Sequence, residues 1–343
     1  MSDDILDMML RTVDRLVAVE ATRDMREGAD GGRFPERLWQ AMETAGITDA
    51  DTIDDDMTGP AEMQALVRHV ARHALPVPLA EVMAARRLLK AAGLGEAAEG
   101  LTGIGTADAG AMALEGGQLT GTLRRVPFGR HLSQVVFAAR DGRGAEHIVV
   151  AARPAAVSAD INLAGEARDD LVFAGEAPVA SAAADGAADQ VMAMGAAFRA
   201  VQIAGALSGA LAQVLTYAGE REQFGRPIGK FQAVQHMLAV LAAETAAASA
   251  AAGIGFAEDG SSSPLRAALA KSRTGQAATE GAALAHQIMG AMGFTREHPL
   301  HYQTRRLWSW RDEFGNEAQW QERLGRDIAS QGGDALWPML TGL

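Results

Sequence analysis

Several short stretches of the sequence combine residue types that can support chemistry. The densest is GEREQFGRPIGKFQ (219–232), which places two arginines, two glutamines, three glycines and two phenylalanines between two long apolar segments. One interpretation is that Arg221 and Gln223 cap helix ends. The other is that they belong to a turn that contacts a ligand.

Two further stretches are weaker candidates. In EHPLH (297–301), His298 and His301 have a spacing compatible with two metal ligands on one turn, but no third ligand lies nearby, so we expect no metal site. RRLWSWRDEF (305–314) carries two tryptophans among arginines, which can stack on adenine but more often mark a packing segment. The sequence contains no Gly-x-Gly-x-x-Gly motif and no P-loop.

The composition narrows the function classes. A chain of 343 residues can bury a substantial core, and its net charge of -12 argues against nucleic acid or anionic lipid as a partner. It has no cysteine, which excludes disulfides, thiolate metal sites and a cysteine nucleophile. The acidic, amphipathic start does not resemble a signal peptide, and we expect no stretch to approach the roughly 20 apolar residues of a membrane span. We therefore expect a cytoplasmic protein.

The hydrophobic pattern changes twice along the chain. Apolar residues recur at helical spacing up to about residue 93, interrupted by the acidic run 49–59, which we expect to be a solvated loop. Short β-branched runs then follow to about residue 185, with a hairpin expected around Asp141-Gly142-Arg143-Gly144. Long helices return after Gly186, over about 192–221, 231–256 and 263–289, the last with Ser263 as N-cap.

This order predicts an α+β fold of three domains. We expect an N-terminal helical domain at 1–97, a small middle β domain at 98–185 and a C-terminal antiparallel helical bundle at 186–343.

Three stretches resemble the acyl-CoA dehydrogenase family, in the order that the family has them. EREQFGRPIGKFQAVQHMLA (220–239) is similar to its Arg-x-Gln-Phe-Gly-x-Pro-Ile turn and the helix that follows. HQIMGAMGFTREHPL (286–300) resembles its Gln-Ile-x-Gly-Gly-x-Gly turn, and FPERLWQAMETAGI (34–47) resembles a segment of its first domain. The resemblance spans nearly the whole chain and implies the acyl-CoA dehydrogenase fold.

The resemblance implies that two turns of the bundle hold the pyrophosphate and adenine end of an FAD bound mainly by a partner subunit. Carried over residue by residue, the cofactor-binding residues are Arg221, Gln223, Phe224, Gln287, Gly290 and Ala291. Arginine offers planar donors to phosphate oxygens. Ala291 stands where the family usually has a second glycine, which puts the close approach of that backbone in doubt.

The catalytic parts of the family pattern are missing. The family's glutamate base lies fifteen residues after the proline of the second turn, and here that position is Phe314. The alternative base position on an earlier helix, immediately before Arg199, is Phe198. Glu313 is one residue from the first position, and it is either a displaced base or part of a charged, solvated segment. We expect no catalytic residue in this chain.

Two further segments depart from the family. Arg125-Val126-Pro127 replaces the Trp-Ile-Thr/Ser strand that lies against the flavin, and proline cannot donate a backbone N–H. TADAG (106–110) is a reduced form of the loop that contacts acyl-CoA. Both losses indicate that the active site is incomplete.

The retained and missing parts resemble the catalytically silent subunit of heteromeric acyl-CoA dehydrogenases. Such a chain pairs with a homologous catalytic subunit in a dimer of heterodimers and completes its FAD site, for an acyl-CoA substrate that is bulky or steroid-derived. Two alternatives remain open: a homomeric acyl-CoA dehydrogenase with Glu313 as displaced base, and a structural or binding protein that has lost FAD.

Overall fold

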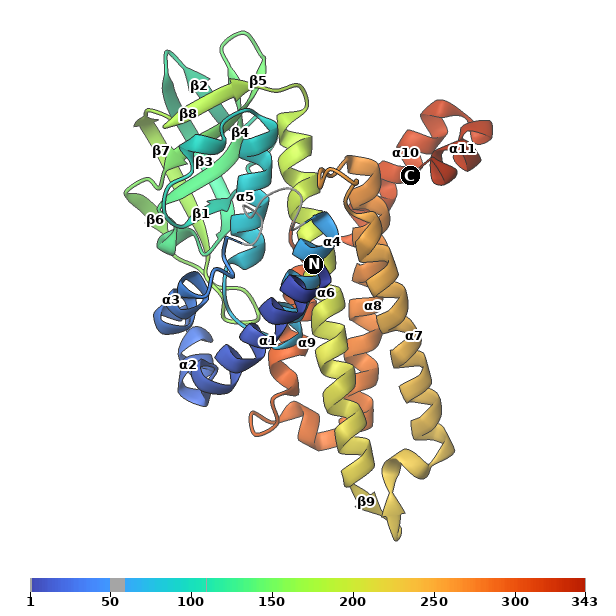
Figure 1. The fold of residues 1–343 in the computed structure, drawn as a ribbon. Coiled ribbons are helices and arrows are strands. Elements are labelled where there is room, and N and C mark those ends of the chain that lie inside the picture. Colours follow the sequence, from blue (N-terminus) through green and yellow to red (C-terminus); the bar gives the residue numbers. More distant parts are fainter. Residues whose placement is uncertain (1, 50–58, 109, 343) are drawn as a thin grey trace.

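A computed structural model describes residues 2–49, 59–108 and 110–342, so most of the acidic run 49–59 and Ala109 of TADAG lie outside the described residues. Three groups of elements follow one another along the chain: helices, a β-sheet, and longer helices (Figure 1). The expected order of the fold is confirmed.

In its described residues, 2–49 and 59–97, the N-terminal group has five helices and one short turn of 3₁₀ helix. Their bounds are α1 (Ser2–Glu20), α2 (Arg23–Ala29), α3 (Glu36–Thr44), α4 (Pro60–Arg72), α5 (Leu79–Ala91) and η1 (Gly95–Ala97). The region is interrupted more often than expected, because Pro35 precedes α3 and two prolines, Pro76 and Pro78, precede α5. Proline fits the start of a helix but not its interior.

The sheet has eight strands and covers residues 102–183. The strands are β1 (Thr102–Ile104), β2 (Met112–Glu115), β3 (Gln118–Pro127), β4 (Gln134–Asp141), β5 (Glu146–Ala152), β6 (Ala156–Ser158), β7 (Arg168–Glu176) and β8 (Ala180–Ala183), with η2 (Gly129–His131) after β3. Their order is β6-β7-β3-β2-β4-β5-β8, and β1 pairs in parallel with β4. The expected hairpin is present, because β4 and β5 are antiparallel with Arg140 opposite Glu146.

The C-terminal group is a helical bundle with two smaller helices after it. Its helices are α6 (Ala187–Glu220), α7 (Gln232–Ile254), α8 (Pro264–Met289), α9 (Leu300–Asp312), α10 (Glu317–Gln331) and α11 (Leu336–Thr341), with 3₁₀ turns η3 (Ile228–Lys230), η4 (Gly290–Phe294) and η5 (Gly333–Ala335). A small hairpin, β9 (Glu222–Gln223) and β10 (Arg226–Pro227), joins α6 to α7. As expected, the Ser263 hydroxyl accepts from the Arg266 N–H and caps α8.

Helix α6 packs directly against α4. A Cβ atom added at Gly205 would lie 2.3 Å from the Arg68 carbonyl oxygen, and one at Gly209 would lie 2.2 Å from that of Arg72. Only glycine permits this approach, so the two helices are in backbone contact along this face. The N-terminal helices are therefore joined to the bundle through a continuous core.

The expectation that no stretch is long and apolar enough to span a membrane is wrong. Two helices, α6 and α7, are long and apolar enough by composition to span a membrane. In α6 this apolar window is 89% buried, because α6 is the central helix of the bundle. In α7 only 28% of the window is buried, so its apolar surface is largely uncovered in this chain.

Candidate functional site

Charged side chains from all three regions meet in one cluster at the junction between the helices and the sheet. Three arginines and three glutamates take part, so their formal charges balance. They are Glu81 on α5, Glu166 before β7, Arg168 on β7, Arg199 on α6, Arg306 on α9 and Glu313 directly after α9.

Glu313 is the centre of this cluster. Its Oε1 accepts from Arg168 Nε at 2.8 Å and from Asn162 Nδ2 at 3.1 Å. Its Oε2 accepts from Arg199 Nε at 2.7 Å and from Arg168 Nη2 at 3.1 Å. Only 13% of the side chain is exposed, so the interpretation of Glu313 as part of a solvated segment is wrong.

The remaining pairs hold the two arginines of Glu313 in place. Arg199 Nη2 donates to Glu81 Oε1 at 2.7 Å, and Arg168 Nη2 donates to Glu166 Oε2 at 3.0 Å. Glu166 in turn accepts from Arg306 Nε at 2.9 Å. Every charge has an opposite partner, which buried charges require.

The pairing sets the protonation of Glu313. Burial by itself would raise the pKa of its carboxyl, but the guanidinium groups of Arg168 and Arg199 outweigh burial and lower the pKa to about 2. A general base works best when its pKa lies near the operating pH. A carboxylate with a pKa of about 2, both of whose oxygens already accept hydrogen bonds, is a poor proton acceptor.

Phenylalanine fills both positions where the family pattern places a base. Phe198 is buried on α6 and packs edge-to-face on Phe256 at 5.1 Å between ring centroids. Phe314 has φ of 53° and lies over α6, where a Cβ added at Gly195 would be 2.3 Å from its ring. Arg199 stacks on the Phe314 ring at 5.3 Å. Both rings are packing elements.

The strand segment Arg125-Val126-Pro127 is occupied by its own contacts. The Arg125 N–H donates to Asp170 Oδ1 at 2.8 Å, and the Arg125 guanidinium pairs with Asp160 at 3.1 Å. Val126 is buried, and Pro127 has no N–H to offer. This strand therefore supplies few donors to a flavin ring.

A cavity of about 600 Å³ lies between this strand and the connection from α9 to α10. Its walls include Arg125, Pro127, Trp308, Glu313 and Phe314. Trp308 is half-buried and stacks on His286 at 5.5 Å, and Trp310, which is buried, donates to Glu166. The tryptophans thus pack inside the protein, and Glu313, the carboxylate next to the family's base position, is held in this wall by two arginines.

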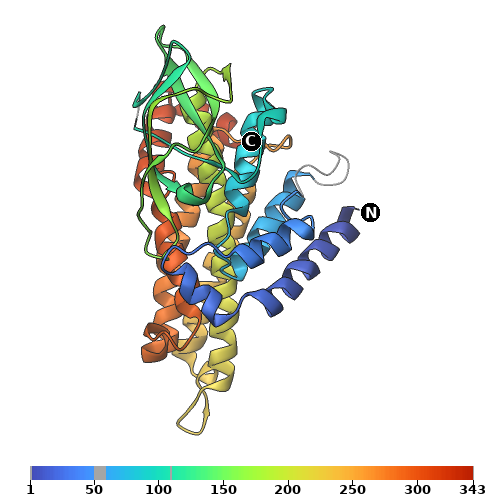
Figure 2. The same cartoon turned by 90° about the vertical axis from the view of Figure 1, so that its left-hand side faces the viewer.

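The six residues that the family resemblance assigns to FAD binding lie away from this cavity. Both turns are at the end of the bundle away from the sheet, as Figure 1 and Figure 2 show from two sides. The first, on the β9–β10 hairpin, bears Arg221, Gln223 and Phe224, all exposed, with Phe224 at 92%. Within the part of the chain that the structure describes, no hydrogen bond or ion pair holds the Arg221 guanidinium.

The second turn, at the end of α8, exposes Gln287, Gly290 and Ala291. Gly290 has φ of 58°, and no atom lies within 4 Å of where a Cβ would be, so this backbone has open space in front of it. The two turns fit a phosphate-bearing group, because one offers a guanidinium and the other an accessible backbone. None of the six residues on these turns lines the cavity beside β3.

Sequence reasoning missed the charged cluster. Its members lie up to 232 positions apart, from Glu81 to Glu313, so no local motif joins them. A signal was nevertheless present: Arg199 and Glu81 are charged residues within apolar helical runs, and buried charges are almost always paired. Among the described residues, His298 and His301 belong to no group of converging metal ligands.

Comparison with known proteins agrees with this geometry. Residues 186–317 match the family model described as the C-terminal domain of acyl-CoA dehydrogenase. The acyl-CoA dehydrogenase FadE34 of Mycobacterium tuberculosis is 34% identical over 151 residues, which are 39% of this chain and 21% of that protein. The chain therefore spans about a fifth of the length of this curated relative.

Two solved structures are similar over nearly the whole chain. The ChsE4-ChsE5 complex from Mycobacterium tuberculosis has a TM-score of 0.82 at 23% identity, covering 94% of this chain and 97% of that chain. A variant of the Tcur3481-Tcur3483 steroid ACAD also has a TM-score of 0.82, at 20% identity, covering 96% of this chain and 99% of that chain. Residues 186–317 thus match the C-terminal domain of the acyl-CoA dehydrogenases, and the whole chain shares the fold of these solved structures.

Proposed function

We propose that this chain is the non-catalytic subunit of a heteromeric acyl-CoA dehydrogenase and completes the FAD site of a homologous catalytic partner. The observation that carries the proposal is the state of Glu313. Its carboxylate is ionised and shared between Arg168 and Arg199, while phenylalanine stands at both familiar base positions. The complex would remove an α-proton from an acyl-CoA, and neither familiar base position of this chain carries a side chain that can accept it.

The cofactor part of the proposal rests on the two turns. FAD, when bound, supplies the redox chemistry of this family. Arg221 would bind its phosphate oxygens, and Gly290 and Ala291 would present backbone to it, with Gln223, Phe224 and Gln287 beside them. These residues point outward from the far end of the bundle, so a cofactor held here needs walls from a second chain.

The exposed surface of α7 is suited to contact with a second chain. Its exposed residues include alanines at helical spacing, namely Ala239, Ala242, Ala243, Ala246 and Ala250. Small apolar residues on one helix face allow a partner helix to approach closely, and obligate interfaces resemble a protein core cut in two. A homologous subunit with the same bundle is the partner we propose.

The similar structures support a proposal for the substrate class. One similar structure is a variant of the Tcur3481-Tcur3483 steroid ACAD, and another is the ChsE4-ChsE5 complex. We propose α,β-desaturation of a bulky, steroid-like acyl-CoA thioester as the reaction of the complex. The homomeric alternative requires Glu313 as base, which its ion pairs oppose. The alternative of a structural or binding protein that has lost FAD gives the exposed Arg221 turn no function.

The test is flavin retention in a complex co-expressed with a base-bearing acyl-CoA dehydrogenase homologue. Arg221→Ala should weaken FAD binding by about 1.5–3 kcal/mol, the usual contribution of a charge-assisted hydrogen bond. Arg143→Ala is the matched control, because Arg143 is an exposed arginine on the distant β4–β5 turn. Equal flavin content in both variants would show that the Arg221 turn does not hold the cofactor.

A further inference from the structure

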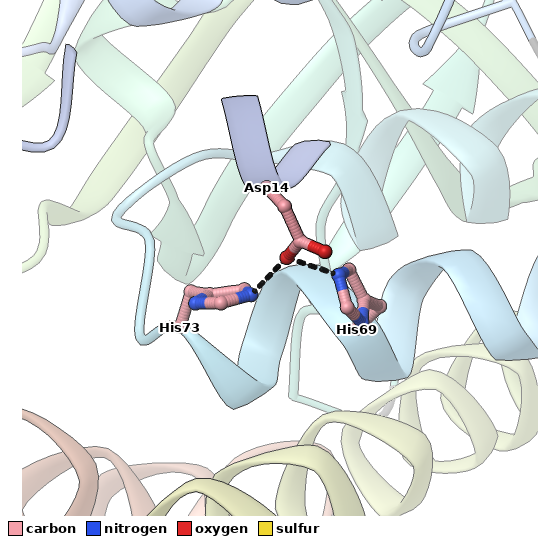
Figure 3. A group of neighbouring side chains, drawn as sticks. All are labelled: Asp14, His69 and His73. Carbon is pink, nitrogen blue, oxygen red and sulfur yellow. Dashed lines mark hydrogen bonds and ion pairs between the residues drawn. The ribbon is translucent and has the colours of Figure 1, made fainter. Parts of the chain in front are cut away.

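A second cluster of polar side chains lies far from the two FAD turns, between α1 and α4. His69 is on α4 and His73 directly follows that helix, one turn further along, so both rings project from the same side (Figure 3). Asp14 comes from α1 and lies between them. Both rings point their Nε2 atoms at one oxygen, Asp14 Oδ1, at 2.8 Å and 2.9 Å.

This arrangement has the geometry of a metal site. The three ligand atoms all lie within 4.8 Å of one another. Zn²⁺ binds nitrogen and oxygen at about 2.0–2.1 Å, which places tetrahedral ligands about 3.3 Å apart. The two observed contacts between nitrogen and oxygen are about half an ångström shorter than that, so each must lengthen slightly to admit an ion.

The surroundings favour an ion at this place. The two histidine side chains are 17% and 26% exposed, whereas Asp14 is 53% exposed. The rings are thus held by packing while one side remains open to water, as in zinc sites with three protein ligands.

We propose that Asp14, His69 and His73 bind a divalent transition-metal ion of the zinc class, with water completing the coordination. Imidazole and carboxylate together suit Zn²⁺, and the chain has no cysteine to compete for it. The ion would fasten α1 to α4, since its ligands come from both elements. The alternative is that the three side chains form only a hydrogen-bonded group.

Zinc titration of the untagged chain, after a chelator has removed bound metals, tests the proposal. Isothermal calorimetry should give one Zn²⁺ per chain, and Co²⁺ should produce the visible absorption of a nitrogen- and oxygen-liganded ion. His69→Ala and His73→Ala should each weaken Zn²⁺ binding about 100-fold or more. His147→Ala is the control, because His147 pairs with a single carboxylate, Asp141, at 3.2 Å.

A second readout does not depend on the variants. Zn²⁺ should slow hydrogen exchange of the α1 amides at least tenfold in the unmodified chain, because the ion joins α1 to α4. His69→Gln, with a side chain that stays polar, replaces His69→Ala if the alanine variant fails to fold. Absence of one-to-one binding, or binding that survives both histidine replacements, would overturn the proposal and leave a hydrogen-bonded group only.

Discussion

Replacement of Glu313 by glutamine separates a structural role from a catalytic one. Gln keeps the shape and one acceptor oxygen but removes the charge that balances Arg168 and Arg199. The pKa of Glu313 falls from an ordinary 4.5 to about 2 in the folded chain. At about 1.36 kcal/mol per pKa unit, the charged form stabilises the fold by about 3 kcal/mol.

We therefore expect Glu313→Gln to lower the free energy of unfolding by about 3 kcal/mol, close to the usual effect of breaking a buried ion pair. Urea denaturation of the isolated chain measures this. Asp312→Asn is the matched control: it is the neighbouring carboxylate and 57% exposed, so it should change stability by no more than about 0.5 kcal/mol.

Turnover of the assembled complex gives the second half of the result. We expect Glu313→Gln to leave it within about threefold, because the carboxylate is not the base. Loss of a true general base costs roughly 10²-fold or more. If turnover collapses while flavin content, assembly and stability stay normal, Glu313 is the base and the reasoning from its ion pairs is refuted.

Three other predictions follow from the structure. Because the pKa of Glu313 is lowered, its contribution to stability is present above pH 4.5 and is lost as the pH falls toward 2, so urea midpoints should drop steeply below pH 4.5 and vary less in Glu313→Gln. Gly209→Ala should destabilise the chain by about 1–3 kcal/mol in thermal unfolding, because the added Cβ would lie 2.2 Å from the Arg72 carbonyl oxygen. Gly219→Ala, on the same helix, should be neutral or slightly stabilising, because no atom lies within 4 Å of its added Cβ. Light scattering of the co-expressed complex should report a mass near four chains, and a stable monomer would count against a shared cofactor site.

The three-part fold was readable from the sequence because its signals are local. Helical spacing, the Ser263-Pro264 start of α8 and the glycine turn of the β4–β5 hairpin each depend on a few adjacent residues. The two bundle turns were likewise found by their residues. The structure adds that both lie at one end of the bundle, which sequence spacing alone does not give.

The charged cluster and the Asp14 group were not readable because their members meet only after folding. Glu313 could be assigned to a solvated segment from its neighbours, yet its partners come from β7 and α6. The spacing of His69 and His73, one helical turn apart, was visible in the sequence. Asp14, which converges on the pair from another helix, was not.

Flavin content, measured on the chain alone and on the chain co-expressed with a base-bearing homologue, tests the central claim most directly. The account predicts little FAD in the isolated chain, since β3 offers few donors to the flavin ring, and about one FAD per heterodimer in the complex. Stoichiometric FAD in the isolated chain would contradict it.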